Sequence, residues 1–344
     1  MRLSAQSDPN RQARRSPSVP NSRQLHSGRM FVHAISEYLP DRVVDNAYFG
    51  QLTGKPAEWF ERLTGIRTRR RASAHENATT MAVEAALRLA TVRPELIAAV
   101  DLVIGSSYTP WDTVGTIAHH VQRKLELDGI RALYLSTACS SFLNSLEIAW
   151  AFSAIGESTG SLIVCAEHNS GFSVDDDLMS GHLWGDGAAA VLVSTSPYPA
   201  AQFEVIDVRS AAFANAGHGP GGVFLEPRGR GLQMPHGKDV FALACRHMQA
   251  MGIALLEANG LSLADVALLV PHQANMRIIE RVAASLGIKA PRIAETVTTL
   301  GNTGSASIPI TMSRYVNTLR EGDVVLMVAF GGGYSAGAAL LRRL

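Results

Sequence analysis

Residues 161–168, SLIVCAEH, are an apolar run, and residues 185–194, GDGAAAVLVS, follow as a glycine turn and a second apolar run. The same order returns at residues 323–330, DVVLMVAF, and 331–344, GGGYSAGAALLRRL. Continuous apolar runs of this kind are typical of strands that are buried on both faces of a sheet. Each copy therefore predicts a buried strand, a glycine-rich turn and a second strand.

The turns that open helices are also paired. Residues 136–150, STACSSFLNSLEIAW, and residues 300–316, LGNTGSASIPITMSRYV, are both small-residue turns that lead into a helix. We interpret the two pairs as an internal duplication with a boundary near residue 200, which gives halves 30–200 and 201–344. The alternative is coincidence in a chain that is rich in alanine and glycine.

From Met30 onward, strand and helix patterns alternate along the chain. This alternation predicts a layered α/β architecture in which helices cover sheets. The expected strands lie at 30–36, 101–106, 132–136, 161–165, 188–194, 203–209, 267–270, 323–329 and 336–342. The expected helices lie at about 78–92, 114–126, 140–155, 238–259, 274–286 and 305–319.

The composition argues against several classes of function. The chain has 344 residues, of which 47% are hydrophobic and 18% charged, so it can build a large core. A net charge of +1 gives no electrostatic footprint for nucleic acid or for an anionic membrane surface. No apolar run approaches the length of a transmembrane helix, so we expect no membrane span.

Cysteine usage indicates a reducing compartment, so we expect a cytoplasmic protein. The chain has only Cys139, Cys165 and Cys245, and an odd, sparse count argues against a disulfide framework. No CxxC or HxxxH cluster is present, so we expect no metal site.

Residues 1–29 differ from the rest of the chain, with six arginines, one acidic residue and three prolines. Few apolar side chains are available to anchor this segment, and we expect a disordered tail. Its arginine and serine content also fits an organelle transit peptide, although the prolines and the missing apolar face argue against one. The plain alternatives are a tail without function, or a protein that begins at Met30.

Cys139 is the first candidate catalytic residue. It follows an expected buried strand and precedes a helix whose apolar residues cover most of its circumference. We predict that the N-terminus of this helix stabilises the thiolate of Cys139, which is the nucleophilic form. The alternative for a lone cysteine is a structural core residue, and we assign Cys165 and Cys245 to that class.

Three further stretches contain candidate catalytic residues, but each stretch taken alone also has a structural explanation. His272 follows a buried strand in PHQANMRIIE (271–280), a position where catalytic groups often stand, although most histidines are solvated or structural. Asn302 lies in LGNTGSASIP (300–309), where an asparagine is usually a cap or turn residue. The glycines of FGGGYSAG (330–337) permit backbone N–H groups to approach a ligand, but a glycine run alone is a weak signal.

The set of motifs and its order are specific. From Met30 to Leu344 the chain resembles the β-ketoacyl-ACP synthase III family of the thiolase superfamily. The motifs that carry the resemblance are EWFERLTGIRTRR (58–70), ENATTMAVEAA (76–86), TACSSF (137–142), WGDGAAAVLV (184–193), PHQANMRI (271–278), GNTGSAS (301–307) and FGGGYSAGAAL (330–340).

The resemblance implies a duplicated α/β fold with five layers, α-β-α-β-α, and a homodimer. It implies that Cys139 accepts an acyl group from acyl-CoA, and that His272 and Asn302 support decarboxylation of a malonyl thioester, with malonyl on acyl carrier protein as the expected extender. Backbone N–H groups of Cys139 and Gly332 would form the oxyanion hole. The implied chemistry needs no cofactor and no metal.

The resemblance also implies binding residues. Trp59 and Arg62 match positions that hold the adenine end of coenzyme A, and Asn275 matches a pantetheine contact. The implied contacts with acyl carrier protein are Gln273, Ala274, Asn275, Met276 and Arg277.

Several positions depart from the family pattern. Ser141 stands where glycine is common, which would alter the turn after the nucleophile. Val114 stands where a bulky aromatic residue often closes the acyl pocket of the partner, which predicts a roomier pocket unless another side chain fills the gap. Lysines that attract an acidic carrier are replaced by Ala242, Ala284 and Ser285, which leaves Arg246, Arg277 and Arg281.

These departures favour a specialised relative and keep a second hypothesis open. In it, the acyl group moves from Cys139 to an oxygen, nitrogen or sulfur nucleophile without decarboxylation. The presence of both His272 and Asn302 favours the decarboxylative condensation. A non-catalytic partner in a dimeric assembly is the third reading, and the presence of Cys139 argues against it.

Overall fold

The computed structural model describes residues 28–198 and 200–344. Most of the predicted tail lies outside these residues. Gly28 and Arg29 belong to the fold rather than to the tail, because Trp150 Nε1 donates to the Gly28 carbonyl at 3.1 Å and Arg29 Nε pairs with Glu204 at 3.0 Å.

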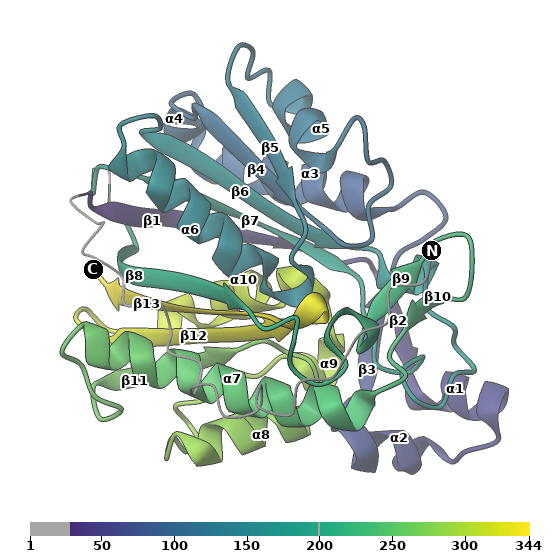
Figure 1. Cartoon of the computed structure of the whole chain (residues 1–344). Helices are drawn as coiled ribbons and strands as arrows, with labels where there is room; N and C mark the ends of the chain where they lie inside the picture. The colour runs from purple at the N-terminus through teal and green to yellow at the C-terminus, as the bar shows by residue number, and fades with distance from the viewer. Residues whose placement is uncertain (1–27, 199) are drawn as a thin grey trace, which may run out of the picture.

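The described strands form one nine-stranded sheet and two small two-stranded sheets. The large sheet has the order β11-β12-β13-β8-β1-β7-β6-β4-β5 (Figure 1). Its strands are β1 (Met30–Tyr38), β4 (Leu102–Ser106), β5 (Arg131–Leu135), β6 (Gly160–Glu167), β7 (Gly187–Ser194), β8 (Phe203–Ala212), β11 (Val266–Pro271), β12 (Val324–Gly331) and β13 (Ser335–Arg343). All nine correspond to predicted strands.

The strand order repeats in the two halves of the sheet. In the first half β4 is parallel to β6, and β7 is antiparallel to both β6 and β1. In the second half β11 is parallel to β12, and β13 is antiparallel to both β12 and β8. The halves join where β1 pairs with β8 over Met30–Val32. The predicted boundary near residue 200 stays a prediction, and it falls in the link between β7 and β8.

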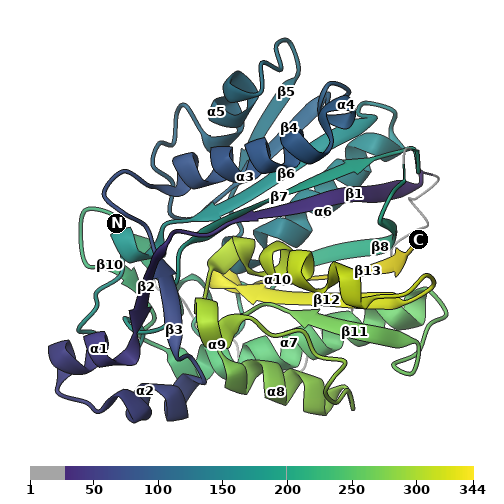
Figure 2. The ribbon, with the colours of Figure 1, turned by 180° about the vertical axis from the view of Figure 1, so that it is seen from behind.

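Helices cover the sheet on both outer faces and fill the space between its halves (Figures 1 and 2). Helices α3 (Ala78–Val92) and α5 (Ile117–Lys124) pack outside the first half, and α7 (Gly237–Ala258) and α8 (Met276–Ser285) pack outside the second. Helices α6 (Ser141–Ala154) and α10 (Ser307–Tyr315) lie between them in the central core. The predicted α-β-α-β-α fold is therefore confirmed.

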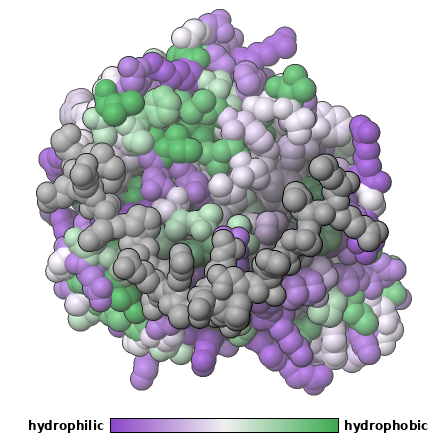
Figure 3. Space-filling view, viewed as in Figure 1, coloured by the Kyte–Doolittle hydropathy of each residue, from purple (hydrophilic) through white to green (hydrophobic). Residues whose placement is uncertain are grey.

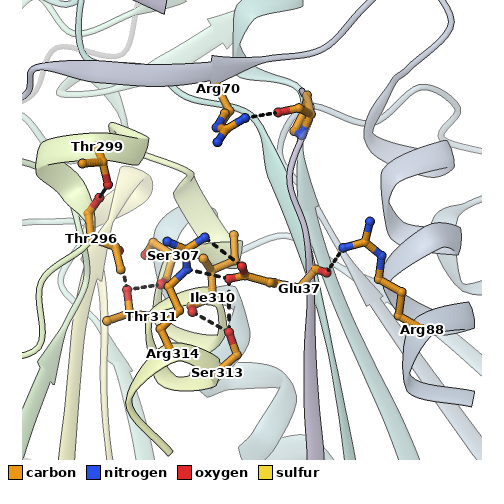
Figure 4. Close-up of polar contacts among 11 residues, drawn as sticks. Glu37, Arg70, Arg88, Thr296, Thr299, Ser307, Ile310, Thr311, Ser313 and Arg314 are labelled. Carbon is orange, nitrogen blue, oxygen red and sulfur yellow. Dashed lines mark hydrogen bonds and ion pairs between the residues drawn. The ribbon is translucent and has the colours of Figure 1, made fainter. Parts of the chain in front are cut away.

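Polar contacts fix the central helix α10 to the first half of the sheet. Arg314 of α10 forms an ion pair with Glu37 of β1 through Nε at 2.9 Å and Nη2 at 2.8 Å. Arg88 of α3 donates to the Glu37 carbonyl at 3.0 Å, so one strand residue is held by helices from two layers (Figure 4). Because α10 begins in the GNTGSAS segment, these contacts also help to fix that segment.

A small subassembly beside the sheet was not predicted. Strands β2 (Arg42–Asp45) and β3 (Thr68–Arg71) pair, and helices α1 (Asn46–Thr53) and α2 (Ala57–Thr64) lie between them in the chain. Gly54 and Gly65 end the two helices in the left-handed region, at φ 72° and 76°. The remaining elements are the short helices α4 (Pro94–Ile97) and α9 (Val297–Leu300), the hairpin β9 (Phe224–Glu226) and β10 (Gly231–Gln233), and single 3₁₀ turns.

Helix α5 begins later than predicted, at Ile117 rather than residue 114. The preceding residues form an exposed turn in which the Asp112 carboxylate accepts N–H bonds from Val114 at 2.8 Å and Gly115 at 3.0 Å. Among the described residues, no helix combines the length and the apolar composition that crossing a membrane requires.

Candidate active site

Cys139 lies in a tight turn between β5 and α6. The 3₁₀ turn Ala138–Ser140 holds it, and Ala138 adopts φ 51°, a left-handed conformation that is costly for alanine. Ser141 stabilises this turn, because its Oγ accepts from the Thr137 N–H at 2.9 Å and donates to the Ala138 carbonyl at 2.6 Å. A serine at this position thus ties the backbone that presents Cys139.

Cys139 opens onto a cavity of about 140 Å³. Tyr108, in the loop after β4, and Trp184 form part of its wall, and the β9–β10 hairpin supplies much of the rest. The lining residues are Tyr108, Ala138, Cys139, Trp184, Val223, Phe224, Leu225, Leu232 and Gly332. Neither Tyr108 nor the hairpin was predicted to belong to the site. The position of Tyr108 after a buried strand was the available signal.

The surroundings of Cys139 raise the pKa of its thiol. Burial raises its pKa to about 12, and the carboxylate of Glu167 adds to the rise because a neighbouring negative charge disfavours the thiolate. The Cys139 backbone N–H lowers the pKa, and the prediction that the helix N-terminus stabilises the thiolate stays a prediction. The effects of burial and of Glu167 exceed that of the nearby N–H donors.

His272 follows β11 and is almost fully buried. Its backbone N–H donates to the Val328 carbonyl at 2.8 Å, and its Nδ1 lies 2.7 Å from the Ser307 hydroxyl. Burial lowers its pKa to about 3, so the imidazole is neutral at ordinary pH. With Nδ1 engaged by Ser307, Nε2 is the ring nitrogen that remains for a substrate.

Asn302 is held in one orientation. Its side-chain Oδ1 accepts from the Gly304 N–H at 2.9 Å, which leaves the Nδ2 amide group as a donor. Its backbone N–H donates to the Leu183 carbonyl at 2.8 Å, and its carbonyl accepts from Gly185 at 3.0 Å and from Asn169 Nδ2 at 3.1 Å. These partners belong to the first half of the chain, so Asn302 is fixed across the joint between the halves.

The three predicted catalytic residues converge on one segment, the turn that opens α10. Asn302 binds Gly304, His272 binds Ser307, and the residues between them, Gly304–Ala306, pack against the Cys139 turn. Figure 4 shows how Thr311 continues this network, since its hydroxyl donates to the Ser307 carbonyl at 2.8 Å.

The glycine run packs directly against the nucleophile. A methyl group at Gly331 would lie 2.5 Å from the Cys139 nitrogen, so only glycine permits this approach. Gly332 lines the cavity beside Ala138. The backbone of the predicted oxyanion hole, Cys139 and Gly332, is therefore in one place, and its role stays a prediction.

Glu167 is a buried carboxylate that the sequence interpretation missed. It ends β6 and accepts hydrogen bonds from Ser107, Tyr108, Thr109 and Ser305. Burial raises its pKa to about 7 despite these donors. It links the loop after β4, which carries Tyr108, to the turn that opens α10. The signal in the sequence was a carboxylate at the end of a continuous apolar strand.

The predicted coenzyme A residues lie on α2, next to the start of α8. Trp59 is half-buried and packs edge-on against His182, with ring centroids 6.0 Å apart, while Arg62 is exposed. Arg277 Nη2 donates to the Arg62 carbonyl at 2.8 Å, and a methyl group at Gly65 would lie 2.4 Å from Met276 Cβ. The fold thus brings together the segments predicted to contact coenzyme A and carrier protein.

One predicted carrier contact is wrong. Gln273 is fully buried, its Nε2 donates to the Pro271 carbonyl at 2.7 Å, and its Oε1 accepts from the Thr296 N–H at 2.9 Å. Both ends of its amide serve the fold, so it does not reach a partner. Asn275 caps α8 by accepting from the Ile278 N–H at 3.0 Å, and Ala274 is partly exposed. The roles predicted for the other segment residues stay predictions.

Val114 lies outside the cavity wall of its own chain and is 86% exposed. Its predicted place in a partner's pocket stays a prediction.

A larger hollow, of about 370 Å³, is lined in part by Arg42, Arg71, Trp111 and His168, and it contains none of the predicted catalytic residues.

Comparisons with known proteins agree with this arrangement. Residues 134–227 match the profile described as 3-oxoacyl-[acyl-carrier-protein (ACP)] synthase III, and residues 256–343 match the profile of its C terminal. The β-ketoacyl-[acyl-carrier-protein] synthase III of Aquifex aeolicus is 34% identical over 89% of this chain and 96% of the relative. That of Thiobacillus denitrificans is 36% identical over 89% of this chain and 96% of the relative.

Two solved structures extend the likeness. The 3-oxoacyl-[acyl-carrier-protein] synthase III from Aquifex aeolicus superposes with a TM-score of 0.84, at 32% identity, over 91% of this chain and 99% of the other. The priming β-ketosynthase from the R1128 polyketide biosynthetic pathway gives a TM-score of 0.84, at 30% identity, over 94% and 99%.

Proposed function

This chain belongs to the 3-oxoacyl-[acyl-carrier-protein] synthase III family, and from that premise we propose that it is a decarboxylative condensing enzyme. It transfers an acyl group from acyl-CoA to Cys139 and joins that group to a malonyl thioester carried by acyl carrier protein. The products are a 3-ketoacyl thioester, CO₂ and free coenzyme A. The observation that carries the proposal is the placement of Cys139, His272 and Asn302 around one turn, Gly304–Ser307.

In the first half-reaction, Cys139 Sγ attacks the thioester carbonyl of acyl-CoA. The carbon–sulfur bond to coenzyme A breaks, the thiol proton leaves with the coenzyme A sulfur, and an acyl-Cys139 thioester remains. The developing oxyanion lies near the backbone N–H groups of Cys139 and Gly332. Each aimed donor of this kind stabilises a transition state by roughly 2.7–4 kcal/mol.

In the second half-reaction, the malonyl group loses CO₂ and its electrons become an enolate on the thioester. Two neutral donors suit this charge, since a fixed positive charge would also stabilise the malonyl carboxylate and so oppose its loss. The neutral imidazole of His272 and the Nδ2 group of Asn302 provide them. The enolate carbon then attacks the acyl-Cys139 carbonyl, and Cys139 leaves as a thiolate that takes up one proton from solvent to restore the thiol. The balance of atoms and electrons requires no cofactor and no metal.

We infer that acyl carrier protein docks near the N-terminus of α8. Arg246, Arg277 and Arg281 are exposed on α7 and α8, and Arg62 lies beside Arg277. A cluster of cations suits an acidic carrier. The smaller number of basic residues predicts weaker docking than in relatives that carry lysines there.

We also infer a homodimer that forms along β5. This strand is the edge of the large sheet, and its Leu133 and Leu135 are only partly buried. Ile148 and Phe152 of α6 are likewise partly buried, and Figure 3 shows apolar side chains gathered on this face. An unpaired edge with apolar flanks is a typical association surface. We expect the dimer to work in the cytoplasm.

Mass spectrometry of the intact protein tests the proposal. The wild type and Cys139→Ala are incubated with a panel of acyl-CoAs and then with malonyl-ACP, while CO₂ is collected. We expect an acyl adduct that needs Cys139 and disappears as CO₂ and a 3-ketoacyl-ACP form. An adduct that resists malonyl-ACP but clears with an alcohol or amine would instead identify an acyltransferase.

A further inference from the structure

Glu167 is a buried carboxylate that the proposed reaction does not use. It is fully buried at the end of β6 and packs beside the turn that opens α10. Burying a carboxylate is costly unless its hydrogen bonds are made, so its partners indicate what it holds in place.

The two oxygen atoms of Glu167 bind two different segments. Oε2 accepts from the loop after β4, from Ser107 Oγ at 3.0 Å, the Thr109 N–H at 3.1 Å and Thr109 Oγ1 at 2.6 Å. Oε1 accepts from the hydroxyl of Ser305, in the turn Gly304–Ala306. One carboxylate therefore joins the loop that lines the Cys139 cavity to the turn that opens α10.

Gly304 packs closely against both ends of this bridge. A methyl group at Gly304 would lie 2.4 Å from the Tyr108 hydroxyl and 2.8 Å from Cγ of Glu167, so only glycine permits this approach. The Gly304 N–H in turn donates to Asn302 Oδ1 at 2.9 Å, and this contact directs the Asn302 amide. A shift of the turn would therefore move a group that donates to the enolate.

The second enolate donor depends on the same segment. Ser307 follows the turn, and its hydroxyl lies 2.7 Å from Nδ1 of His272. The proposed loading step instead uses the thiol of Cys139 and the backbone N–H groups of Cys139 and Gly332, which lie in other segments. Loss of the contact between Glu167 and the turn should therefore disturb the second half-reaction more than the first.

We propose that Glu167 is a positioning residue for the decarboxylation step. Its carboxylate binds Thr109 with one oxygen and Ser305 with the other, and so fixes the turn that places both enolate donors. Hydrogen bonds to an ionised carboxylate are about twice as strong as neutral ones, which suits a fixed contact. The inference rests on the proposed condensation and adds to it a residue outside the reacting groups.

Substitutions at the two ends of the bridge test the inference. Ser305→Ala removes the hydroxyl in the turn, and Thr109→Val removes the hydroxyl in the loop. The rates of Cys139 acylation and of CO₂ release from malonyl-ACP are measured separately at pH 8, above the Glu167 pKa of about 7. For each variant we expect CO₂ release to slow by about tenfold and acylation to change by less than about threefold. Thr109→Ser keeps the hydroxyl and should behave like the wild type.

Ser170→Ala is the matched control. The Ser170 hydroxyl also donates to a buried carboxylate, that of Asp186, which accepts a further hydrogen bond from the Ala72 N–H rather than from the turn. We expect both rates of this variant to stay close to those of the wild type.

The double variant, Thr109→Val with Ser305→Ala, shows whether the two hydroxyls act through Glu167. If they do, its CO₂ release should be little slower than that of the slower single variant, because the bridge is already broken. Independent effects would multiply to roughly a hundredfold and would overturn the inference.

Other outcomes separate this inference from the proposed function. Equal slowing of acylation and of CO₂ release in Ser305→Ala overturns the inference and leaves the proposed function intact, because the contact would then serve the fold in general. A wild type that forms no acyl adduct, or that forms one and releases no CO₂, contradicts the proposed function and with it this inference.

Discussion

The Ser307 hydroxyl lies 2.7 Å from Nδ1 of His272, and this contact sets how the imidazole meets a substrate. When Ser307 donates to Nδ1, the ring proton resides on Nε2, where it can stabilise an enolate. Ser307→Ala removes the hydrogen bond that places the His272 ring proton on Nε2. We expect CO₂ release to slow by about tenfold, while Cys139 acylation is less affected. Separate assays of the two half-reactions provide the check. Ser313→Ala, on the same helix, is the control, since Ser313 binds Glu37 instead.

Asn302→Asp keeps the shape of the side chain but replaces the donor group with an acceptor. We expect the rate of decarboxylation to fall by about a hundredfold, because the new carboxylate loses a hydrogen bond to the enolate and repels its charge. Acylation of Cys139 should persist and accumulate as a stable adduct. Release of labelled CO₂ from malonyl-ACP measures the effect, and a fall of less than threefold would contradict the role of Asn302.

The raised pKa of Cys139, about 12, predicts a specific pH dependence. The thiolate fraction grows tenfold for each pH unit below the pKa, so alkylation by iodoacetamide should accelerate steadily between pH 7 and pH 10 without a plateau. The rate is followed by the mass of the intact protein, with Cys139→Ala to correct for Cys165 and Cys245. A rate that levels off between pH 9 and pH 10 would show that the thiol has an ordinary pKa.

Glu167 predicts a pH dependence of stability. Its pKa is raised from 4.5 to about 7, so the folded protein holds a proton that the unfolded chain releases. Stability should therefore fall by about 3 kcal/mol as the pH rises from 4.5 to 7, and show no further loss from this group above that. Glu167→Gln should lack this contribution. Chemical denaturation gives the free energy of unfolding of the wild type and of Glu167→Gln at pH 5 and at pH 7.5. The titration of His272 affects both proteins equally, so it cancels when the wild type is compared with the variant.

Leu133 on β5 tests the inferred dimer. Leu133→Asp places a charge on the apolar edge, and we expect the dissociation constant of the dimer to rise by about thirtyfold or more. Sedimentation velocity across a concentration series measures it, and circular dichroism checks the fold. Val92→Asp is the control, because Val92 is 69% exposed at the end of α3. Equal behaviour of the two variants would place the interface elsewhere.

The sequence predicted the frame of the fold because its strands are continuous apolar runs. A strand made of such a run places apolar side chains on both faces of the sheet, so it is expected in the interior. Strands β6, β7, β12 and β13 lie where the sequence predicts them. Helix α3 matches its predicted range because Asn77 caps it and its apolar positions repeat at helical spacing. Helices α1 and α2 were missed because each is only eight residues long and gives a weak periodic signal.

The site was predictable where chemistry follows from local position, as for Cys139 and His272 at strand ends. It was not predictable where the property depends on the surroundings. The pKa of Cys139 depends on burial and on Glu167, which is distant in sequence. The resemblance implied that Gln273 contacts a carrier protein, but the side chain is buried and its amide binds Pro271 and Thr296. Tyr108 and Trp184 could not be predicted as cavity-lining residues, because segments that are distant in the sequence enclose the cavity.

The hydrogen bonds of Asn302 to Leu183, Gly185 and Asn169 have a consequence for biogenesis. Translation delivers Cys139 long before His272 and Asn302, so the nascent first half carries a nucleophile without its partners. Catalytic competence arises only when the last segments have docked. Enzyme activity is therefore a late marker of maturation, and a truncated chain that ends before α10 would carry the cysteine but be unable to complete a turnover.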